Sequence, residues 1–254
     1  MNGIKAVVII PARYASTRLP MKLILPEVKS VTGRYIIEHV YQNVKSAKRI
    51  NKVIVATDHQ RIFDIVKEFG GEAEMTSVSH TSGTDRIAEV ARKLNADIIV
   101  NVQGDEPEVN AVMVDQVVDA LAEDKEAVIA TLANRIKDTE ELTNPNVVKV
   151  VLDNRGYALY FSRSQIPFVR DSKNPINESG AVFLRHLGIY SYRREFLLKY
   201  SKLPASALES VEKLEQLRVL SNGFKIKVAI TNYTSRGIDT KEDLMAFMER
   251  YKHD

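Results

Sequence analysis

The sequence contains no cysteine, so disulfide bonds, thiolate catalysis and zinc–cysteine sites are excluded. Its five histidines show neither an HExxH motif nor another metal-ligand spacing. No apolar run approaches the roughly 20 residues that a membrane-spanning helix needs. The first residues also lack the basic start and long apolar stretch of a signal peptide. We therefore expect a cytoplasmic protein that has no membrane partner.

The chain also lacks a strong excess of charge of one sign. Its formal net charge is +3, and the cations are spread out without a block of like charges. This balance is too weak to indicate nucleic acid as a partner, but it suits a small anionic ligand. No stretch rich in glycine, serine or proline divides the 254 residues. We expect a single domain over 1–254, long enough to bury a full core.

The first half of the chain alternates strand and helix patterns. Such repeated βα units predict a doubly wound, mostly parallel sheet that is covered on both faces. The expected strands are 7–11, 52–57, 74–76 and 97–103, and helical spacing follows each of them, around 36–44, 62–69, 87–94 and 114–121.

The pattern changes in the second half. Two strands, 147–152 and 157–161, flank the turn Asp153–Gly156 and predict an antiparallel hairpin insert. Helical spacing over 211–220 predicts one helix that stops at Asn222-Gly223. Further strands are expected at 127–132, 186–192 and 225–230, and a last helix at 241–251.

The first strand runs into a loop that carries three cations. Arg13, Arg18 and Lys22 lie within ten residues of one another, directly after the apolar run 6–10. In open α/β sheets, ligands bind outside the carboxyl ends of the strands. The cations could be solvated loop residues, but their clustering favours binding of a polyanion. The loop has no GxxxxGK[ST] motif, so it is not a Walker A sequence.

Two carboxylates follow other strands. Asp105 lies in the segment Gln103–Pro107, which could also be an ordinary turn. Asp239 lies in Gly237–Thr240, where it could simply cap the helix that follows. Mg²⁺ is commonly held by one or two carboxylates together with substrate phosphates. Together, the two residues predict a magnesium site that faces a triphosphate.

The segment Ser82–Arg86 resembles a capping box at the start of a helix. Such a helix N-terminus can also bind anions or polar base edges, with Arg86 one turn into the helix. In the second half, the residue pattern alone assigns no function to Arg163, His186, Glu215 and Gln216. His186 could be a hydrogen-bonded core histidine, and Glu215 could be a solvated carboxylate on the surface.

These motifs together resemble the 3-deoxy-manno-octulosonate cytidylyltransferase family, also called CMP-KDO synthetases. The matching segments span nearly the whole chain in order, and GYALYFSR and LRHLGIY are specific to the family. The segments are IIPARYASTRLP, VATDHQRI, SGTDRIAEV, IVNVQGDEP, NPNVVKVVLD, GYALYFSRSQIP, FLRHLGIYSYRREFL, LEQLRVL and GIDTKEDL.

The resemblance implies a fold like that of nucleotide-diphospho-sugar transferases and a reaction in which a sugar acid, KDO, attacks the α-phosphate of CTP. It also implies Mg²⁺ as cofactor, a product that supplies lipopolysaccharide synthesis, and a homodimer whose interface and sugar-binding insert lie around 127–192. The implied catalytic residues are Arg13, Lys22, Asp105 and Asp239, of which Asp105 and Asp239 hold the metal. The implied nucleotide-binding residues are Ala12, Arg13, Arg18, Lys22, Ser82, Arg86 and Gln103. The implied sugar-acid residues are Arg163, His186, Tyr190, Glu215 and Gln216.

One segment departs from the family pattern. The family usually has Leu-Pro-Gly-Lys where this chain has Leu19-Pro20-Met21-Lys22, and glycine there permits a positive φ. The following segment, 23–32, is longer than usual and is expected to be a loop that reshapes the site. Two alternatives therefore stand beside KDO coupling: the same chemistry on another sugar acid, such as 8-amino-KDO, or a non-catalytic nucleotide- or sugar-binding protein.

Overall fold

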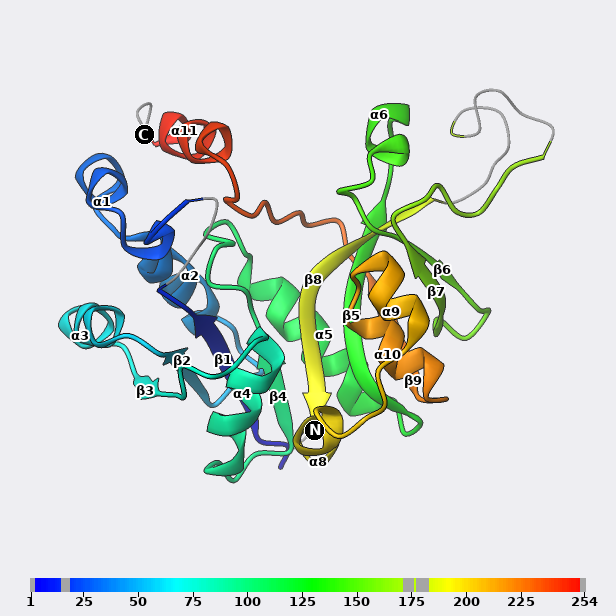
Figure 1. Ribbon diagram of the computed structural model, residues 1–254, viewed down its shortest axis with the longest axis horizontal. Helices are drawn as coiled ribbons and strands as arrows, with labels where there is room; N and C mark the ends of the chain where they lie inside the picture. The colour runs from blue at the N-terminus through cyan, green and yellow to red at the C-terminus, as the bar shows by residue number, and fades with distance from the viewer. Residues whose placement is uncertain (1–2, 15–18, 171–175, 177–182, 252–254) are drawn as a thin grey trace.

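The computed structural model describes residues 3–14, 19–170, 176 and 183–251. In this part of the chain, the strands form one nine-stranded sheet of order β3-β2-β1-β4-β8-β5-β9, with β6 and β7 attached beside β8 (Figure 1). The strands are β1 Ala6–Ala12, β2 Lys52–Thr57, β3 Ala73–Met75, β4 Ile98–Asn101, β5 Ala127–Arg135, β6 Lys149–Leu152, β7 Ala158–Ser162, β8 Leu184–Arg193 and β9 Lys225–Ile230.

Helices cover both faces of this sheet because its central strands are apolar on both sides. In β1, the side chains of Val8 and Ile10 join one buried cluster, and those of Val7 and Ile9 join the other. The first cluster includes residues of α2, α3, α5 and α11, and the second includes residues of α4, α8 and α10. The helices are η1 Lys22–Ile24, α1 Pro26–Thr32, α2 Ile36–Lys45, α3 Gln60–Glu68, α4 Gly83–Arg92, α5 Ala111–Glu123, α6 Thr139–Thr143, α8 Arg194–Tyr200, α9 Ala207–Glu212, α10 Gln216–Ser221 and α11 Lys241–Arg250.

The predicted fold class is confirmed. Strands β3, β2, β1 and β4 pair in parallel, as do β5 and β9. Strand β8 runs antiparallel between β4 and β5, and β6 and β7 form the expected antiparallel hairpin. Of the expected insert 127–192, strands β5 and β8 belong to the main sheet, and the hairpin lies beside them (Figure 1).

Two local expectations were wrong. The segment 23–32 is not a loop: it continues η1 and then forms α1, which has proline at its first position and ends at Gly33 in the left-handed region. The single helix expected over 211–220 is broken into α9 and α10. Lys213 adopts φ 55° and ψ 45° between them, a conformation that a continuous helix does not contain.

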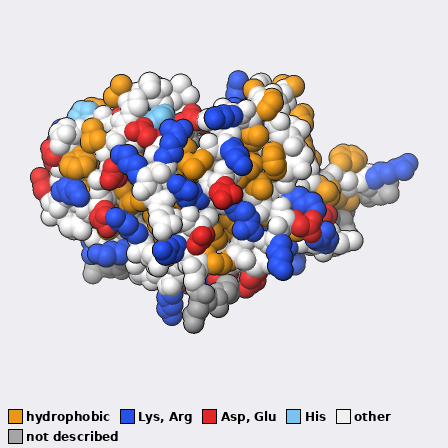
Figure 2. All heavy atoms as spheres, turned by 90° about the horizontal axis from the view of Figure 1, so that it is seen from below, with side chains coloured by type: hydrophobic (Ala, Val, Ile, Leu, Met, Phe, Trp, Pro, Cys, Tyr) orange, Lys and Arg blue, Asp and Glu red, His pale blue; other side chains and the backbone are white. Residues whose placement is uncertain are grey.

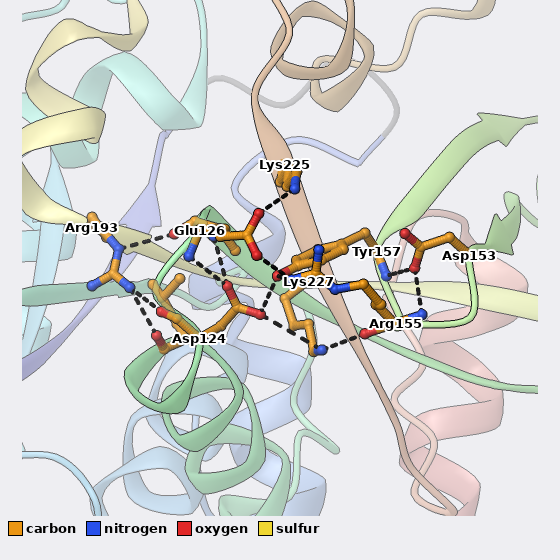
Figure 3. Close-up of polar contacts among 10 residues, drawn as sticks. Asp124, Glu126, Asp153, Arg155, Tyr157, Arg193, Lys225 and Lys227 are labelled. Carbon is orange, nitrogen blue, oxygen red and sulfur yellow. Dashed lines mark hydrogen bonds and ion pairs between the residues drawn. The ribbon is translucent and has the colours of Figure 1, made fainter.

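A network of charged and aromatic side chains fastens the hairpin to the main sheet (Figure 3). The Tyr157 hydroxyl donates a hydrogen bond to Asp124, beyond the end of α5. Glu126 pairs with both Arg155 in the hairpin turn and Lys225 at the start of β9. The Tyr157 ring also lies beneath the cationic groups of Arg155 and Lys225. The network joins the hairpin turn to the amino-terminal ends of β5 and β9.

Charge is mixed over one face of the molecule. On the face seen in Figure 2, Lys and Arg side chains alternate with acidic and apolar ones and form no continuous patch. No helix in the described ranges is both long and apolar enough to span a lipid bilayer.

A buried histidine on α2 packs against the C-terminal helix α11. His39 on α2 is 4% exposed, shares a hydrogen bond with the Thr32 hydroxyl, and packs edge-on against the Phe247 ring of α11. Burial, followed by the nearby Arg34 cation, lowers the pKa of His39 from 6.5 to about 4. The folded protein therefore holds this side chain neutral.

This histidine should make stability dependent on pH. Its contribution is complete above pH 6.5 and is lost as the pH falls toward 4, because the unfolded chain takes up the proton first. We expect the variant His39→Phe, which keeps a ring but cannot titrate, to lose less stability over that range. The difference should be at most about 3 kcal/mol, measured by urea unfolding at several pH values. Parallel loss in both proteins would contradict this role.

Candidate active site

A cavity of about 330 Å³ opens at the carboxyl ends of β1 and β4. Its walls come from the loop after β1, the start of α4, the segment after β4 and the segment before α11. The residues that line it are Pro11, Arg13, Lys22, Leu23, His80, Thr81, Ser82, Gly83, Arg86, Gln103, Gly104, Asp105, Glu215 and Asp239. The structure therefore brings together Arg13, Lys22, Ser82, Arg86, Gln103, Asp105 and Asp239, which the sequence assigned to this site.

The ammonium group of Lys22 joins three segments at the rim of this cavity. It lies 2.6 Å from Oδ2 of Asp105, 3.0 Å from Oδ1 of Asp239 and 2.8 Å from the carbonyl oxygen of Ile238. Asp239 is not the cap of α11, because Thr240 and Asp243 form the capping box there. The two carboxylates that the sequence paired thus converge on one positive charge.

The same carboxylates have the chemistry that a magnesium ion prefers. Both offer hard oxygen atoms toward one point, which the Lys22 ammonium group occupies in this structure. No group of three or more acidic or histidine side chains in the described ranges could hold a metal by itself. Two carboxylates suit the mode in which Mg²⁺ shares its coordination with substrate phosphates and water.

Close packing of β1 against the segment after β4 positions Asp105. A β-carbon at Gly104 would lie 2.9 Å from the carbonyl oxygen of Pro11, so only glycine fits without a shift of the backbone. Behind Asp105, burial, followed by the charges of Asp105 and Asp239, raises the pKa of Glu106 to about 7. Glu106 follows Asp105 in the segment Gln103–Pro107, but its side chain does not line the cavity.

A buried ion pair holds the cation on α4. The guanidinium group of Arg86 is 2.7 Å from Oδ2 of Asp58, which follows β2, and it also donates to Thr76. The residue is 3% exposed, so the pair fixes its position in the wall. The hydroxyl of Ser82 caps α4 by accepting the backbone N–H of Asp85, which confirms the predicted cap.

The loop after β1 has an unusual backbone at Met21. This residue adopts φ 55° and ψ 20°, the left-handed region that glycine occupies without strain. The Tyr14 hydroxyl contacts the Met21 sulfur atom, and the Tyr14 ring stacks on His59 at 3.6 Å. The backbone that the family's glycine allows is thus retained here with a methionine. Arg18, predicted in the same loop, lies outside the described residues.

A second cavity of about 210 Å³ adjoins the first. Gly83, Gln103 and Glu215 line both. The hydroxyl of Thr84 donates to Glu215, and burial raises the pKa of this carboxyl. The remaining lining residues are Thr84, Asn101, Ile129, Tyr190, Tyr192, Tyr200, Lys213, Leu214, Gln216 and Val219. Tyr190, Glu215 and Gln216, which the resemblance assigned to the sugar acid, therefore line one cavity.

Three predicted site residues do not line either cavity. Ala12 is fully buried in the core, within β1. Arg163 donates to the carbonyl oxygens of Glu212 and Pro145. His186 shares a hydrogen bond with Thr131, and burial lowers its pKa to about 3.

Several residues in the two walls or directly behind them had no separate signal in the sequence. Asp58 pairs with Arg86, and its position directly after a predicted strand was the one hint of this role in the sequence. Tyr192 and Tyr200 look like core aromatic residues, and burial raises the pKa of both, so their phenols stay neutral. Lys213 was hidden inside an expected helix.

The model of one protein family, described as cytidylyltransferase, matches residues 7–226. The chain belongs to the cytidylyltransferase family. The 3-deoxy-manno-octulosonate cytidylyltransferase of Geotalea daltonii is 49% identical over 253 residues, which are 98% of each chain. That of Thermodesulfovibrio yellowstonii is 48% identical over 244 residues, covering 93% of this chain and 94% of its own. The resemblance found in the sequence is confirmed.

Solved structures agree with this assignment. A CMP:2-keto-3-deoxy-manno-octonic acid synthetase complexed with CTP superposes with a TM-score of 0.90 at 41% identity, covering 98% of this chain and 99% of its own. The 4-diphosphocytidyl-2C-methyl-D-erythritol synthase of Anaerococcus prevotii has a TM-score of 0.64 at 18% identity, covering 100% of both chains. This second likeness extends to the fold alone.

The backbone at Met21 leads to a test of strain. We expect the Met21→Gly variant to be more stable than the Met21→Ala variant by about 1 kcal/mol in urea unfolding, because alanine keeps the positive φ and loses the thioether contact. At an ordinary helical position the order is reversed, since glycine costs about 1 kcal/mol relative to alanine. An alanine variant at least as stable as the glycine variant would show that Met21 is not strained.

Proposed function

We propose that the protein is a 3-deoxy-manno-octulosonate cytidylyltransferase that couples CTP to KDO. The observation that carries the proposal is the Lys22–Asp105–Asp239 cluster, which lies in the wall of the first of two adjoining cavities. The first cavity suits the nucleotide and the second the sugar acid. Relatives at 48–49% identity that carry this name support the choice of substrates.

The reaction breaks a phosphoanhydride bond of CTP and forms a phosphate ester with the sugar acid. The anomeric hydroxyl oxygen of KDO attacks the α-phosphorus of CTP, and the bond between that phosphorus and the oxygen bridging to the β-phosphate breaks. Pyrophosphate leaves with the electron pair, and the hydroxyl proton passes to solvent. The product, CMP-KDO, would supply lipopolysaccharide synthesis. Such transfers depend on positioning and charge neutralisation more than on a protein nucleophile.

The residues of the first cavity provide these two functions. Arg13 and Lys22 place positive charge beside the triphosphate, and the resemblance assigns the same role to Arg18. Ser82, Gln103 and Arg86 present polar groups to the cytidine. Asp105 and Asp239 would hold Mg²⁺, which acidifies an attacking hydroxyl and shields a leaving pyrophosphate.

We also propose that the enzyme is a cytoplasmic homodimer whose interface includes the insert 127–192. Exposed apolar side chains in this segment support the proposal. Leu159 on β7 is 61% exposed, and Phe168 in the loop after it is 82% exposed. Apolar surface that remains exposed to water is typical of interaction surfaces when it is contiguous. Light scattering of the purified chain measures the mass directly.

Removal of one carboxylate should abolish turnover. We expect Asp105→Asn to reduce pyrophosphate release from CTP, Mg²⁺ and KDO by at least about 100-fold, because the amide cannot neutralise a metal ion. The half-buried Asp119 on α5, which pairs with Arg49 and lines neither cavity, provides a matched control as Asp119→Asn. Full activity of Asp105→Asn would exclude it from catalysis.

The choice of sugar acid needs its own measurement. We expect the purified protein to release pyrophosphate with KDO, and at least tenfold more slowly with 8-amino-KDO or N-acetylneuraminate, since one exchanged polar group in a hydrogen-bonding site is discriminated strongly. Preference for the amino sugar would keep the reaction and change the substrate. No release with any acid would favour a binding protein.

A further inference from the structure

The second cavity contains one positive charge. Among the described residues that line it, Lys213 is the sole lysine or arginine, and Glu215 is the one carboxylate. Arg163, which the resemblance assigned to the acid sugar, is turned toward the backbone carbonyls of Pro145 and Glu212. A sugar acid in this cavity would bring a carboxylate beside Glu215, and Lys213 is the group that can balance the two negative charges.

The backbone of Lys213 is held in an unfavourable conformation. Lys213 and Met21 are the two non-glycine residues with positive φ in the described ranges. Met21 gains a contact with Tyr14, whereas the Lys213 side chain makes no hydrogen bond or ion pair within these ranges. Glycine or asparagine would form the same turn at lower cost. Strain of this kind at a ligand-facing residue points to a functional role.

Neighbouring residues fix this turn from both sides. The Glu212 carboxylate accepts hydrogen bonds from the Ser162 hydroxyl and from the backbone N–H of Arg163. Beyond the turn, the Tyr200 hydroxyl donates to the carbonyl oxygen of Glu215. The base of the Lys213 side chain is therefore anchored at the wall of the cavity, although the residue itself is exposed.

We propose that the ammonium group of Lys213 binds the carboxylate of the sugar acid and is a specificity-determining residue of the enzyme. The inference rests on the proposed function, because it assumes that the second cavity accepts the acid. The side chain selects a charged substrate over a neutral sugar of the same shape. Glu215 and Gln216 then remain available for hydroxyl groups.

A purely structural role makes a different prediction. A cation beyond the C-terminus of a helix interacts favourably with the helix dipole, and Lys213 follows α9 directly. If this were its whole contribution, substitution would change stability and leave the affinity for the sugar acid unchanged. Glycine at this position separates the two roles, because it relieves the backbone and removes the charge.

The experiment measures steady-state pyrophosphate release by the full-length protein, with KDO varied at saturating CTP and CTP varied at saturating KDO. We expect Lys213→Gly and Lys213→Gln to raise the KM for KDO about tenfold and to leave the KM for CTP unchanged. Lys213→Arg should restore most of the affinity. Lys202→Gln, an exposed lysine outside both cavities, is the matched control.

A second substrate tests the charge directly. The carboxamide of KDO has the same shape without the negative charge. The wild-type protein should use it about tenfold less efficiently than KDO, and Lys213→Gln should barely distinguish the two. Thermal unfolding of Lys213→Gly should show a melting temperature equal to or above that of the wild type.

The outcomes separate the inference from the proposed function. An active wild type, together with a Lys213→Gly variant that melts higher and keeps the KM for KDO, would overturn the role of Lys213 and leave the cytidylyltransferase intact. Equal discrimination against the carboxamide by the wild type and by Lys213→Gln would do the same. A wild type without activity on any sugar acid would overturn the proposed function, and the role of Lys213 with it.

Discussion

The contact of the Lys22 ammonium group with Asp105 and Asp239 is the interaction on which the site depends. The two carboxylates follow β4 and β9, which lie on opposite sides of β8 in the sheet, and Lys22 comes from the loop after β1. Like charges this close would repel without a cation between them. The ion pairs therefore hold three separate segments at one point, where a metal ion and a triphosphate would need them.

The two cavities share a wall, and the sharing explains how two substrates can meet. Gly83 and Gln103 belong to both linings, at the start of α4 and after β4. Glu215 reaches the same boundary from the turn before α10. A nucleotide on one side and an acid on the other would have their reacting groups at this boundary. Alignment of the reactants, rather than an activated side chain, is what this architecture supplies.

The sequence predicted the sheet well, because continuous apolar runs in strands such as 52–57 bury both faces whatever the distant contacts are. It also predicted that Arg13, Lys22, Asp105 and Asp239 lie near one another, since the segments that follow the parallel strands gather at one edge of the sheet. It failed where backbone conformation decides the outcome. The break at Lys213 has no glycine to mark it, and the direction of the Arg163 side chain depends on carbonyl groups from distant segments.

The reversed direction of β8 has a consequence for how the protein can change. Parallel strands contribute their ends to the ligand edge, whereas β8 contributes its first half there and places Tyr190 opposite Asn101. The lining of the first cavity thus comes mainly from the first half of the chain, and that of the second cavity mainly from the second half. Under the proposed function, substitutions in β8 and the α9–α10 turn would alter which acid is accepted while the lining of the first cavity stays unchanged, so this architecture could diversify one substrate independently of the other.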